Sequence, residues 1–406
     1  MQLKLLNFHK ILSQFASNIV GAFIALIIYQ STDSFSYAFL FMFIAMALRI
    51  FITKIFYKQM AKRPQLFLLI RLIPFLLYSV CVLLFDTPYR VLGIVLASIF
   101  YGFTVAFKDI PLEFVFSYSS LNKGTSSLGL SRFISYCGVI LAIILGGLFL
   151  DNLPKWIAIF VACVTYLISV IPLFIYYLKN RKTKGFNKEA ISNAVESFKQ
   201  IKIKKHQQTV ISKKLLTKYF IIYLLFCVYD ALISLFNLYL FKVSAESYGL
   251  TSYIQASFYG MFALGCFVSG KLDEKLDLTK IVCFCCVFSG ILVCLVPLVT
   301  HLFWLEIILF ALIGFCYSFV SIFCYSRMMT RCKIMGVSNR ALLNRAQASR
   351  WAQMIIYGVA MLSPVMFIPA FILTGLMFAS CSIAIPINEE KTREILVDYL
   401  ENNKLY

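Results

Sequence analysis

Long apolar runs alternate with short polar segments along most of this 406-residue chain. A helix needs about 20 predominantly apolar residues to cross a bilayer. Backbone polar groups in lipid must bond internally, so only helices or a closed barrel can span it. The strands of a membrane barrel are segments of about ten residues in which apolar and polar residues alternate. The apolar runs of this chain are longer and do not alternate. The pattern therefore predicts an all-α, polytopic membrane protein with about twelve transmembrane helices. The predicted spans are 11–29, 36–56, 66–85, 91–107, 128–150, 156–178, 219–241, 251–269, 281–299, 302–325, 342–362 and 365–385.

The composition supports this prediction and removes other classes. The chain is 61% hydrophobic and 14% charged, whereas a soluble domain is about half apolar and a quarter charged. A net charge of +20 would suggest nucleic acid on a soluble protein, but here the basic residues separate the apolar runs, as topology signals do. The expected partner is the lipid bilayer, with no nucleic acid. The 13 cysteines are scattered without nearby histidine or acidic ligands, so neither a metal site nor a cofactor is predicted.

Lysine and arginine are distributed unequally between the two sets of loops, which predicts the orientation. Short loops rich in these residues stay in the cytoplasm. The opposite set of loops contains only Arg90, Lys155 and Lys242. Both termini are therefore predicted to be cytoplasmic, in a cell membrane. The basic set of loops contains Lys58, Lys62, Arg63, Lys123, Lys271, Lys275, Lys280, Arg327, Arg331, Lys333 and Arg340.

One long hydrophilic stretch divides the spans into six and six. Residues 179–218 contain twelve lysines or arginines against Glu189 and Glu196. We interpret this stretch as a cytoplasmic linker on the anionic inner leaflet, to which each basic residue contributes about 1 kcal/mol. The predicted organisation is a six-helix bundle over 1–178, the linker 179–218, a second bundle over 219–386, and a cytoplasmic tail over 387–406 that contains a short helix.

The two bundles share a short sequence echo. Ser131-Arg132-Phe133 opens the fifth span, and Ser349-Arg350-Trp351 lies in the eleventh, 218 residues further on. Gly138-Val139 and Gly358-Val359 follow at nearly the same offset. Together with the six-linker-six layout, the echo predicts two parallel six-helix pseudo-repeats.

The loop after the eighth span carries a recognisable motif. Gly270-Lys271-Leu272-Asp273-Glu274-Lys275 matches the start of a loop signature, Gly-x-x-x-Asp-Arg/Lys, with Glu274 in place of aspartate. With the layout of the spans, this motif resembles the major facilitator superfamily in a diverged form. The resemblance implies a latch that includes Gly270, Glu274 and Lys275. It also implies that spans one, four, seven and ten line a central path.

The resemblance further implies a secondary transporter that moves a small or amphipathic solute by alternating access, with proton coupling left open. The alternatives are a flippase for a lipid-linked molecule and an integral-membrane lipid-handling enzyme. Only three histidines are present and they are far apart, which argues against histidine-rich metal chemistry. The sequence does not indicate the small-molecule substrate.

Two carboxylates inside the apolar spans are the first candidates for the path. A charge at bilayer depth is costly, so it usually faces a cavity or a partner. Asp230 lies near the middle of the seventh span, where it could bind a proton or cation, or form an internal salt bridge with an arginine. Glu306 lies near the outer end of the tenth span, where it could exchange protons or reach the outer water.

Other polar residues are weaker candidates for the same path. Arg132 and Arg350 occupy matching places in the two halves. They could bind an anionic group, since guanidinium forks suit carboxylate and phosphate, or they could extend to the inner interface. Gln14 and Asn18 share one face of the first span, and Asn237 lies two turns beyond Asp230; these amides could bond a substrate or another helix.

Charged residues also gather at the inner ends of the second and fourth spans. Arg49 lies within the second span, and Asp109 and Glu113 are four residues apart, on one face of a helix. We interpret the group as a salt-bridge network at the helix ends, with an inner gate as the alternative role.

Overall fold

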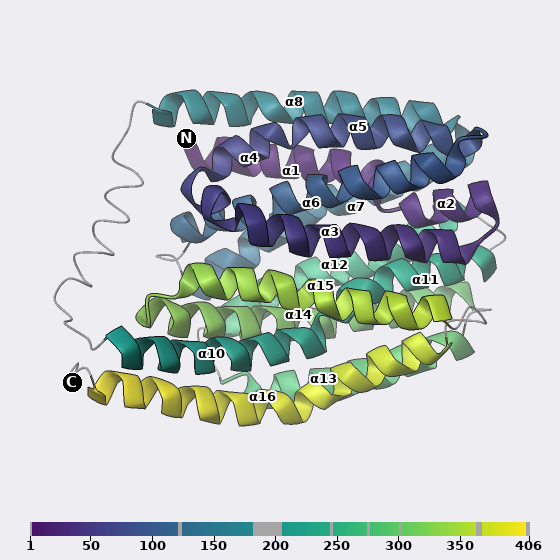
Figure 1. Cartoon of the computed structure of the whole chain (residues 1–406). Coiled ribbons are helices and arrows are strands. Elements are labelled where there is room, and N and C mark those ends of the chain that lie inside the picture. Colours follow the sequence, from purple (N-terminus) through teal and green to yellow (C-terminus); the bar gives the residue numbers. More distant parts are fainter. Residues whose placement is uncertain are drawn as a thin grey trace.

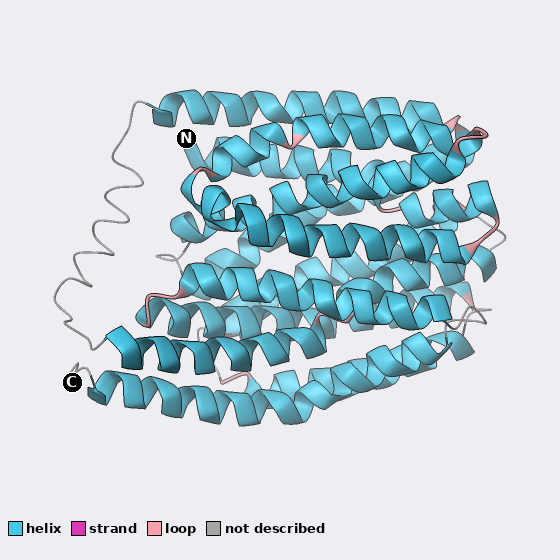
Figure 2. Ribbon diagram, viewed as in Figure 1, coloured by secondary structure: helices cyan, strands magenta, loops and turns pink. Residues whose placement is uncertain are grey.

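The apolar runs form helices, and every described element is helical. The computed structural model describes residues 2–120, 124–181, 205–243, 247–273, 277–299, 302–362 and 368–402, and within these ranges there is no strand (Figure 2). Since a helix bonds its own backbone, this is the expected response of a chain placed in lipid. The predicted all-α class is confirmed.

The helices divide into two groups along the chain, on either side of residues 182–204 (Figure 1). The first group comprises α1 (Gln2–Gly21), α2 (Ile24–Thr32), α3 (Phe35–Lys62), α4 (Pro64–Ile70), α5 (Leu72–Leu83), the 3-10 helix η1 (Leu84–Asp86), α6 (Arg90–Ser120), α7 (Gly124–Asn152) and α8 (Lys155–Arg181). The second comprises α10 (Lys205–Phe226), α11 (Tyr229–Val243), α12 (Tyr248–Leu272), α13 (Thr279–Leu295), the 3-10 helix η2 (Val296–Leu298), α14 (Phe303–Ile334), α15 (Ser338–Leu362) and α16 (Ile368–Asn402).

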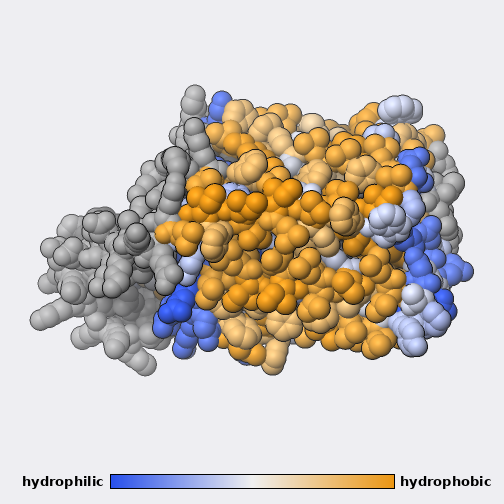
Figure 3. Space-filling model, turned by 90° about the horizontal axis from the view of Figure 1, so that it is seen from above, coloured by the Kyte–Doolittle hydropathy of each residue, from blue (hydrophilic) through white to orange (hydrophobic). Residues whose placement is uncertain are grey.

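Consecutive pieces combine into about twelve membrane-crossing units. Ten units in the described ranges are long and apolar enough to cross a bilayer by length and composition. The other two are α12 and α15, which lie among them, and α15 is polar at its start as the sequence indicates. Figure 3 shows a continuous apolar surface over the middle of the molecule, with hydrophilic residues toward both ends. This belt is the surface that a bilayer would cover.

Three predicted spans are interrupted, which the hydrophobic pattern does not indicate. The first span breaks between Gly21 and Ile24, the third at Arg71, and the seventh between Phe226 and Tyr229. At the seventh, the Asp230 amide bonds the Cys227 carbonyl at 3.1 Å, three residues back. The interruption starts a new helix at Tyr229 and places Asp230 in its first turn, where a carboxylate is stabilised by the positive end of the helix dipole.

The two halves meet along two seams, α7 against α12 and α3 against α15. Glycines allow the first seam to close. A Cβ atom on Gly129 would lie 2.3 Å from the Cys266 carbonyl oxygen, and one on Gly147 would lie 2.6 Å from the Ser252 Cβ. Only glycine fits at such a backbone approach, so α7 and α12 pack closely at both of their ends.

Both chain ends lie at the same end of the bundle (Figure 1). An even number of spans requires this, whereas the cytoplasmic location of that end stays a prediction. At the carboxyl end the tail is helical, as the sequence predicts, but it does not begin a helix of its own. Helix α16 continues without interruption through Pro386 to Asn402, so the tail extends the last span. The linker also becomes helical at Lys205, and its residues 182–204 lie outside the described ranges.

Candidate functional site

A polar cavity of about 440 Å³ lies between the two halves. Its lining comes from α1, α3, α6 and α7 of the first half and from α10, α11, α12, α14 and α15 of the second, together with Cys227, which lies between α10 and α11. The four spans implied by the family resemblance are all included. The lining contains nine charged residues: Lys10, Arg49, Lys108, Asp109, Glu113, Arg132, Asp230, Arg345 and Arg350.

The cavity lies toward the end that carries the termini. Lys10, in the first third of the span that α1 and α2 form, and Glu113, in the last third of α6, both line it. Arg345, in the second turn of α15, does so as well. Since the first two belong to the first half and Arg345 to the second, both halves contribute charge at this end.

One polar face of α1 reaches the cavity. Lys10, Gln14 and Asn18 are spaced by four residues and all three line it. The Asn18 side-chain amide donates to the Gln14 backbone carbonyl at 2.7 Å. The Lys108 ammonium donates to the Gln14 side-chain oxygen at 2.8 Å. The predicted pair Gln14 and Asn18 is therefore at the site.

Asp230 faces the cavity and is exposed to it. Its carboxylate accepts hydrogen bonds from the Tyr317 hydroxyl at 3.0 Å and the Ser349 hydroxyl at 2.7 Å. Among the described residues no lysine or arginine lies within ion-pair distance of it. The interpretation of Asp230 as half of an internal salt bridge is therefore not supported by the geometry.

The expected salt-bridge network is present, and it reaches across the halves. Arg49 Nη2 lies 2.5 Å from Asp109 Oδ2, within the first half. Glu113 pairs with Arg345 of α15 in the second half. The Arg345 guanidinium also stacks over the Tyr325 ring, 4.9 Å from its centre. Glu113 and Arg345 thus tie α6 to α15 beside the cavity.

The two arginines of the sequence echo both line the cavity, from opposite halves. The Arg132 guanidinium donates to the Ser321 hydroxyl at 2.8 Å and lies over the Tyr325 ring. Arg350 is 1% exposed and donates to the Arg49 carbonyl oxygen at 2.9 Å and to Thr53. Both bonds come from Nη1, and Nη2 has no hydrogen-bond partner. Both side chains thus lie inside the protein, between the halves.

Two predicted path residues are absent from the lining of this cavity. Asn237 is 4% exposed and Glu306 is 3% exposed, both enclosed by neighbouring helices. One side-chain oxygen of each has no hydrogen-bond partner. Glu306 does not reach the surface, so the alternative of contact with outer water does not fit the structure.

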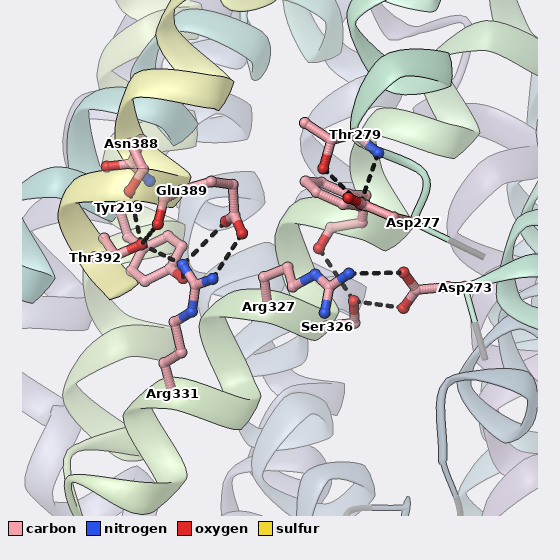
Figure 4. A network of polar contacts seen from close by, with 11 residues as sticks. Tyr219, Asp273, Asp277, Thr279, Ser326, Arg327, Arg331, Asn388, Glu389 and Thr392 are labelled. Carbon is pink, nitrogen blue, oxygen red and sulfur yellow. Dashed lines mark hydrogen bonds and ion pairs between the residues drawn. The ribbon is translucent and has the colours of Figure 1, made fainter. Parts of the chain in front are cut away.

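The predicted latch is only partly described. Gly270 is buried in α12 and packs near Gly129, whereas Glu274 and Lys275 lie outside the described ranges. The neighbouring Asp273 contacts α14: its Oδ2 accepts from the Ser326 hydroxyl at 2.9 Å, and its Oδ1 lies 3.9 Å from Arg327 (Figure 4). The described part of the motif therefore contacts both halves, since Gly270 packs against α7 and Asp273 bonds α14.

A second cluster in Figure 4 joins α14 to α16. Arg331 Nη2 lies 2.6 Å from Glu389 Oε2, and Arg331 also bonds Thr392 and, at 3.3 Å, the Tyr219 hydroxyl. These Arg331 bonds attach the tail segment to the bundle.

Nearby, the Thr279 hydroxyl and backbone amide donate to the Asp277 carboxylate, and these bonds hold the pKa of that carboxyl below its ordinary value.

Sequence reasoning missed several lining residues. Lys10 is absent from the predicted site, although its four-residue spacing from Gln14 and Asn18 could have identified it. Tyr136 and Tyr259 stack at 5.7 Å between ring centres, one from each half. No pattern in a single sequence distinguishes them among 23 tyrosines.

At the end away from the termini the halves are joined by different contacts. Asp151, near the end of α7, accepts from the amides of Tyr248 and Gly249 at 2.8 and 2.7 Å and from the Ser247 hydroxyl at 2.9 Å. The Tyr248 hydroxyl donates to the Gln30 side chain at 2.7 Å. These contacts cap α12 from the opposite half.

Two helical halves around a polar cavity, within an apolar belt, define the architecture of a membrane transporter. The chain belongs to the Major Facilitator Superfamily, whose family model matches residues 13–364. No curated protein matches the chain.

Among solved structures, the chain is similar to a bacterial homologue of the iron transporter ferroportin in an outward-facing state. The TM-score is 0.69 at 11% identity, over 96% of this chain and 100% of that one. A structure of a bacterial homologue of ferroportin in the outward-facing state with soaked iron has a TM-score of 0.64 at 11% identity, over 98% of each chain. At this identity the likeness establishes the fold.

Proposed function

We propose that the protein is a secondary transporter that carries a small polar solute through the central cavity by alternating access. The carrying observation is the cavity itself, which both halves line with charged and hydroxyl-bearing side chains. Its volume of about 440 Å³ lies within the roughly 300–1,000 Å³ usual for small-molecule sites. The family relationship supports transport, whereas the mechanism and the solute are our proposal.

The contacts between halves suggest how access alternates. If both termini lie on the cytoplasmic side of a cell membrane, the Asp151 contacts close the outer end of the cavity. The Glu113–Arg345 pair stands beside the cavity at the inner end. Both sets of contacts are formed in this structure. Rocking of one half against the other would break the outer set in one state and the inner set in the other. In this proposal Asp230 is the proton-coupling group, because it is a carboxylate exposed to the cavity without an arginine partner among the described residues.

Counterflow in proteoliposomes tests this function. Vesicles holding the purified full chain are preloaded with unlabelled solute, and uptake of trace labelled solute is followed. A carrier gives a transient overshoot above equilibrium, whereas an open channel gives none. Net modification of a lipid without counterflow would favour the lipid-handling enzyme, and movement of a labelled lipid between leaflets would favour the flippase.

A cross-link gives an independent test of alternation. The Asp151→Cys/Ser247→Cys pair joins the two halves at the proposed outer gate, where the native side chains are 2.9 Å apart. Oxidation should stop counterflow and reduction should restore it. The native protein carries 13 cysteines, so wild type and each single variant, oxidised in parallel, are the controls. Undiminished counterflow in the cross-linked pair would contradict alternating access at this gate.

A further inference from the structure

We propose that the solute is a small organic anion that carries a carboxylate or phosphate group. The inference rests on the proposed function and concerns the charge of the same cavity. Six of its lining residues are cationic and three are carboxylates, so positive charges outnumber negative ones by three. Like charges gathered in a protein cavity, where the effective dielectric constant is lower than in bulk water, repel one another, and a bound anion relieves that repulsion.

The pairing of these charges shows which cations remain for a ligand. Two of the three carboxylates are already neutralised, Asp109 by Arg49 and Glu113 by Arg345. Asp230 bonds hydroxyl groups. Among the described residues, Lys108, Arg132 and Arg350 have no carboxylate within ion-pair distance.

The three unpaired cations are built into the protein, since each is fixed by neutral groups. Lys108 donates to Gln14, Arg132 donates to Ser321, and Arg350 donates to the Arg49 carbonyl oxygen. Arg350 is almost fully buried and keeps one nitrogen without a hydrogen-bond partner. A buried charge without a counter-charge is costly, so its presence beside a cavity points to a ligand that completes it. Guanidinium groups bind carboxylate and phosphate through paired hydrogen bonds.

The rest of the lining suits an organic part of modest size. The stacked rings of Tyr136 and Tyr259 come from opposite halves, and Phe262 packs against Tyr136 at 4.9 Å between ring centres. Phe226 also lines the cavity. An anion with a short carbon skeleton can place its charged group among the cations and its carbon atoms on these rings. A divalent cation would meet the excess of positive charge instead.

Ligand-induced thermal stabilisation of the purified full chain tests the charge preference. The probes are succinate and glycerol 3-phosphate as anions, choline as an organic cation, glucose as a neutral solute, and ferrous iron as the metal. A ligand that binds the native state raises its melting temperature with concentration. We expect at least one anion to stabilise the protein and choline and ferrous iron not to.

Charge-removing variants then locate the site. Arg132→Gln and Arg350→Gln should each weaken anion binding by about tenfold or more, because each leaves the anion with one charged partner fewer. Lys214→Gln is the matched control: it removes one positive charge from an exposed position of α10 outside the cavity, and binding should change by less than about twofold. If Arg350→Gln does not fold, Lys108→Gln replaces it.

The proposal is overturned if no anion probe stabilises wild type, or if choline or ferrous iron does so while the anions do not. Anion binding unchanged in both arginine variants overturns it as well. Counterflow separates this failure from that of the transporter itself. Counterflow of choline or glucose would support the transport function and contradict the anion preference. Anion binding without counterflow of that anion would support the anion preference and contradict the transport function.

Discussion

Asp151 and Gly249 join the two halves of the protein at the end away from the termini. Asp151 Oδ2 accepts a 2.7 Å hydrogen bond from the Gly249 amide, and Oδ1 accepts one from the neighbouring Tyr248 amide. The first amides of a helix have no partner within it, and a carboxylate there is stabilised by the helix dipole. The start of α12 therefore depends on a side chain from the other half.

Asp151→Ala should expose these amides. Loss of a helix cap costs about 1 kcal/mol, so hydrogen exchange at Tyr248 and Gly249 should accelerate about fivefold or more. Mass spectrometry of the peptide covering 247–252 measures it. Asp33→Asn is the control. Asp33 is an exposed residue that ends α2 at the same end of the bundle, and among the described residues it has no hydrogen bond or ion pair with the other half. Equal protection in the Asp151 variant would show that the cap does not hold the halves.

The Glu113–Arg345 pair should behave as a unit across the halves. Glu113→Arg or Arg345→Glu alone places like charges together, so we expect counterflow to fall by about tenfold. The double variant restores opposite charges and should recover part of the rate. Recovery is partial because Arg345 also stacks on Tyr325. A double variant no better than the slower single variant would mean that the two residues act separately.

Asp230→Asn tests proton coupling. The amide keeps the size of the carboxylate and one acceptor for Tyr317 or Ser349, and no described arginine is left unpaired. We expect normal expression and insertion, loss of accumulation driven by a pH gradient, and retained exchange. The measurement is uptake into proteoliposomes over a range of imposed pH gradients. Accumulation with the pH dependence of wild type would exclude Asp230 as the proton carrier.

Gly147→Ala should destabilise the seam between α7 and α12. The added Cβ would lie 2.6 Å from the Ser252 Cβ and 2.8 Å from the Tyr248 carbonyl oxygen. Overpacking of this kind costs about 1–3 kcal/mol, which thermal unfolding in detergent would detect as a lower melting temperature. Gly358→Ala is the matched control, because nothing lies within 4 Å of its added Cβ. The control should be neutral or stabilised by up to about 1 kcal/mol. Equal melting temperatures would contradict the close approach.

Hydropathy predicts the helical class and the approximate number of spans, because the bilayer imposes one length and one hydrogen-bonding rule on every span. The rarity of charge at bilayer depth likewise identifies Asp230 as a cavity residue. Glu306 was predicted on the same reasoning, and Asn237 as a hydrogen-bonding amide, yet neither lines the cavity. The reason is depth: Asn237 lies about 10 Å along the helix from Asp230, and Glu306 about 16 Å from Tyr317, both toward the joined end of the halves.

Pairings across the halves could not be predicted. Glu113 and Arg345 are 232 residues apart, and helical periodicity gives only the face of each residue on its own helix. The interruptions of the first and seventh spans were also hidden, because the residues between their helices, Ala22 and Phe23 in the first and Cys227 and Val228 in the seventh, are as apolar as the rest of the run. The third span breaks at Arg71, a charged residue that hydropathy averages into its apolar surroundings. Hydrophobicity indicates whether a segment lies in lipid or in water. Side-chain packing decides the angle of each helix and the helices that it contacts.

The continuous helix α16 has a practical consequence for imaging this molecule. Its 35 residues extend about 50 Å at 1.5 Å per residue, well beyond a hydrocarbon core of about 30 Å. Arg331 bonds its protruding part to α14, and the buried Tyr399 packs there near its end. A soluble helical domain fused in register after Asn402 would therefore be held rigidly, at a defined angle to the bundle. Such a fusion would give a small, otherwise featureless membrane protein an external marker for particle alignment.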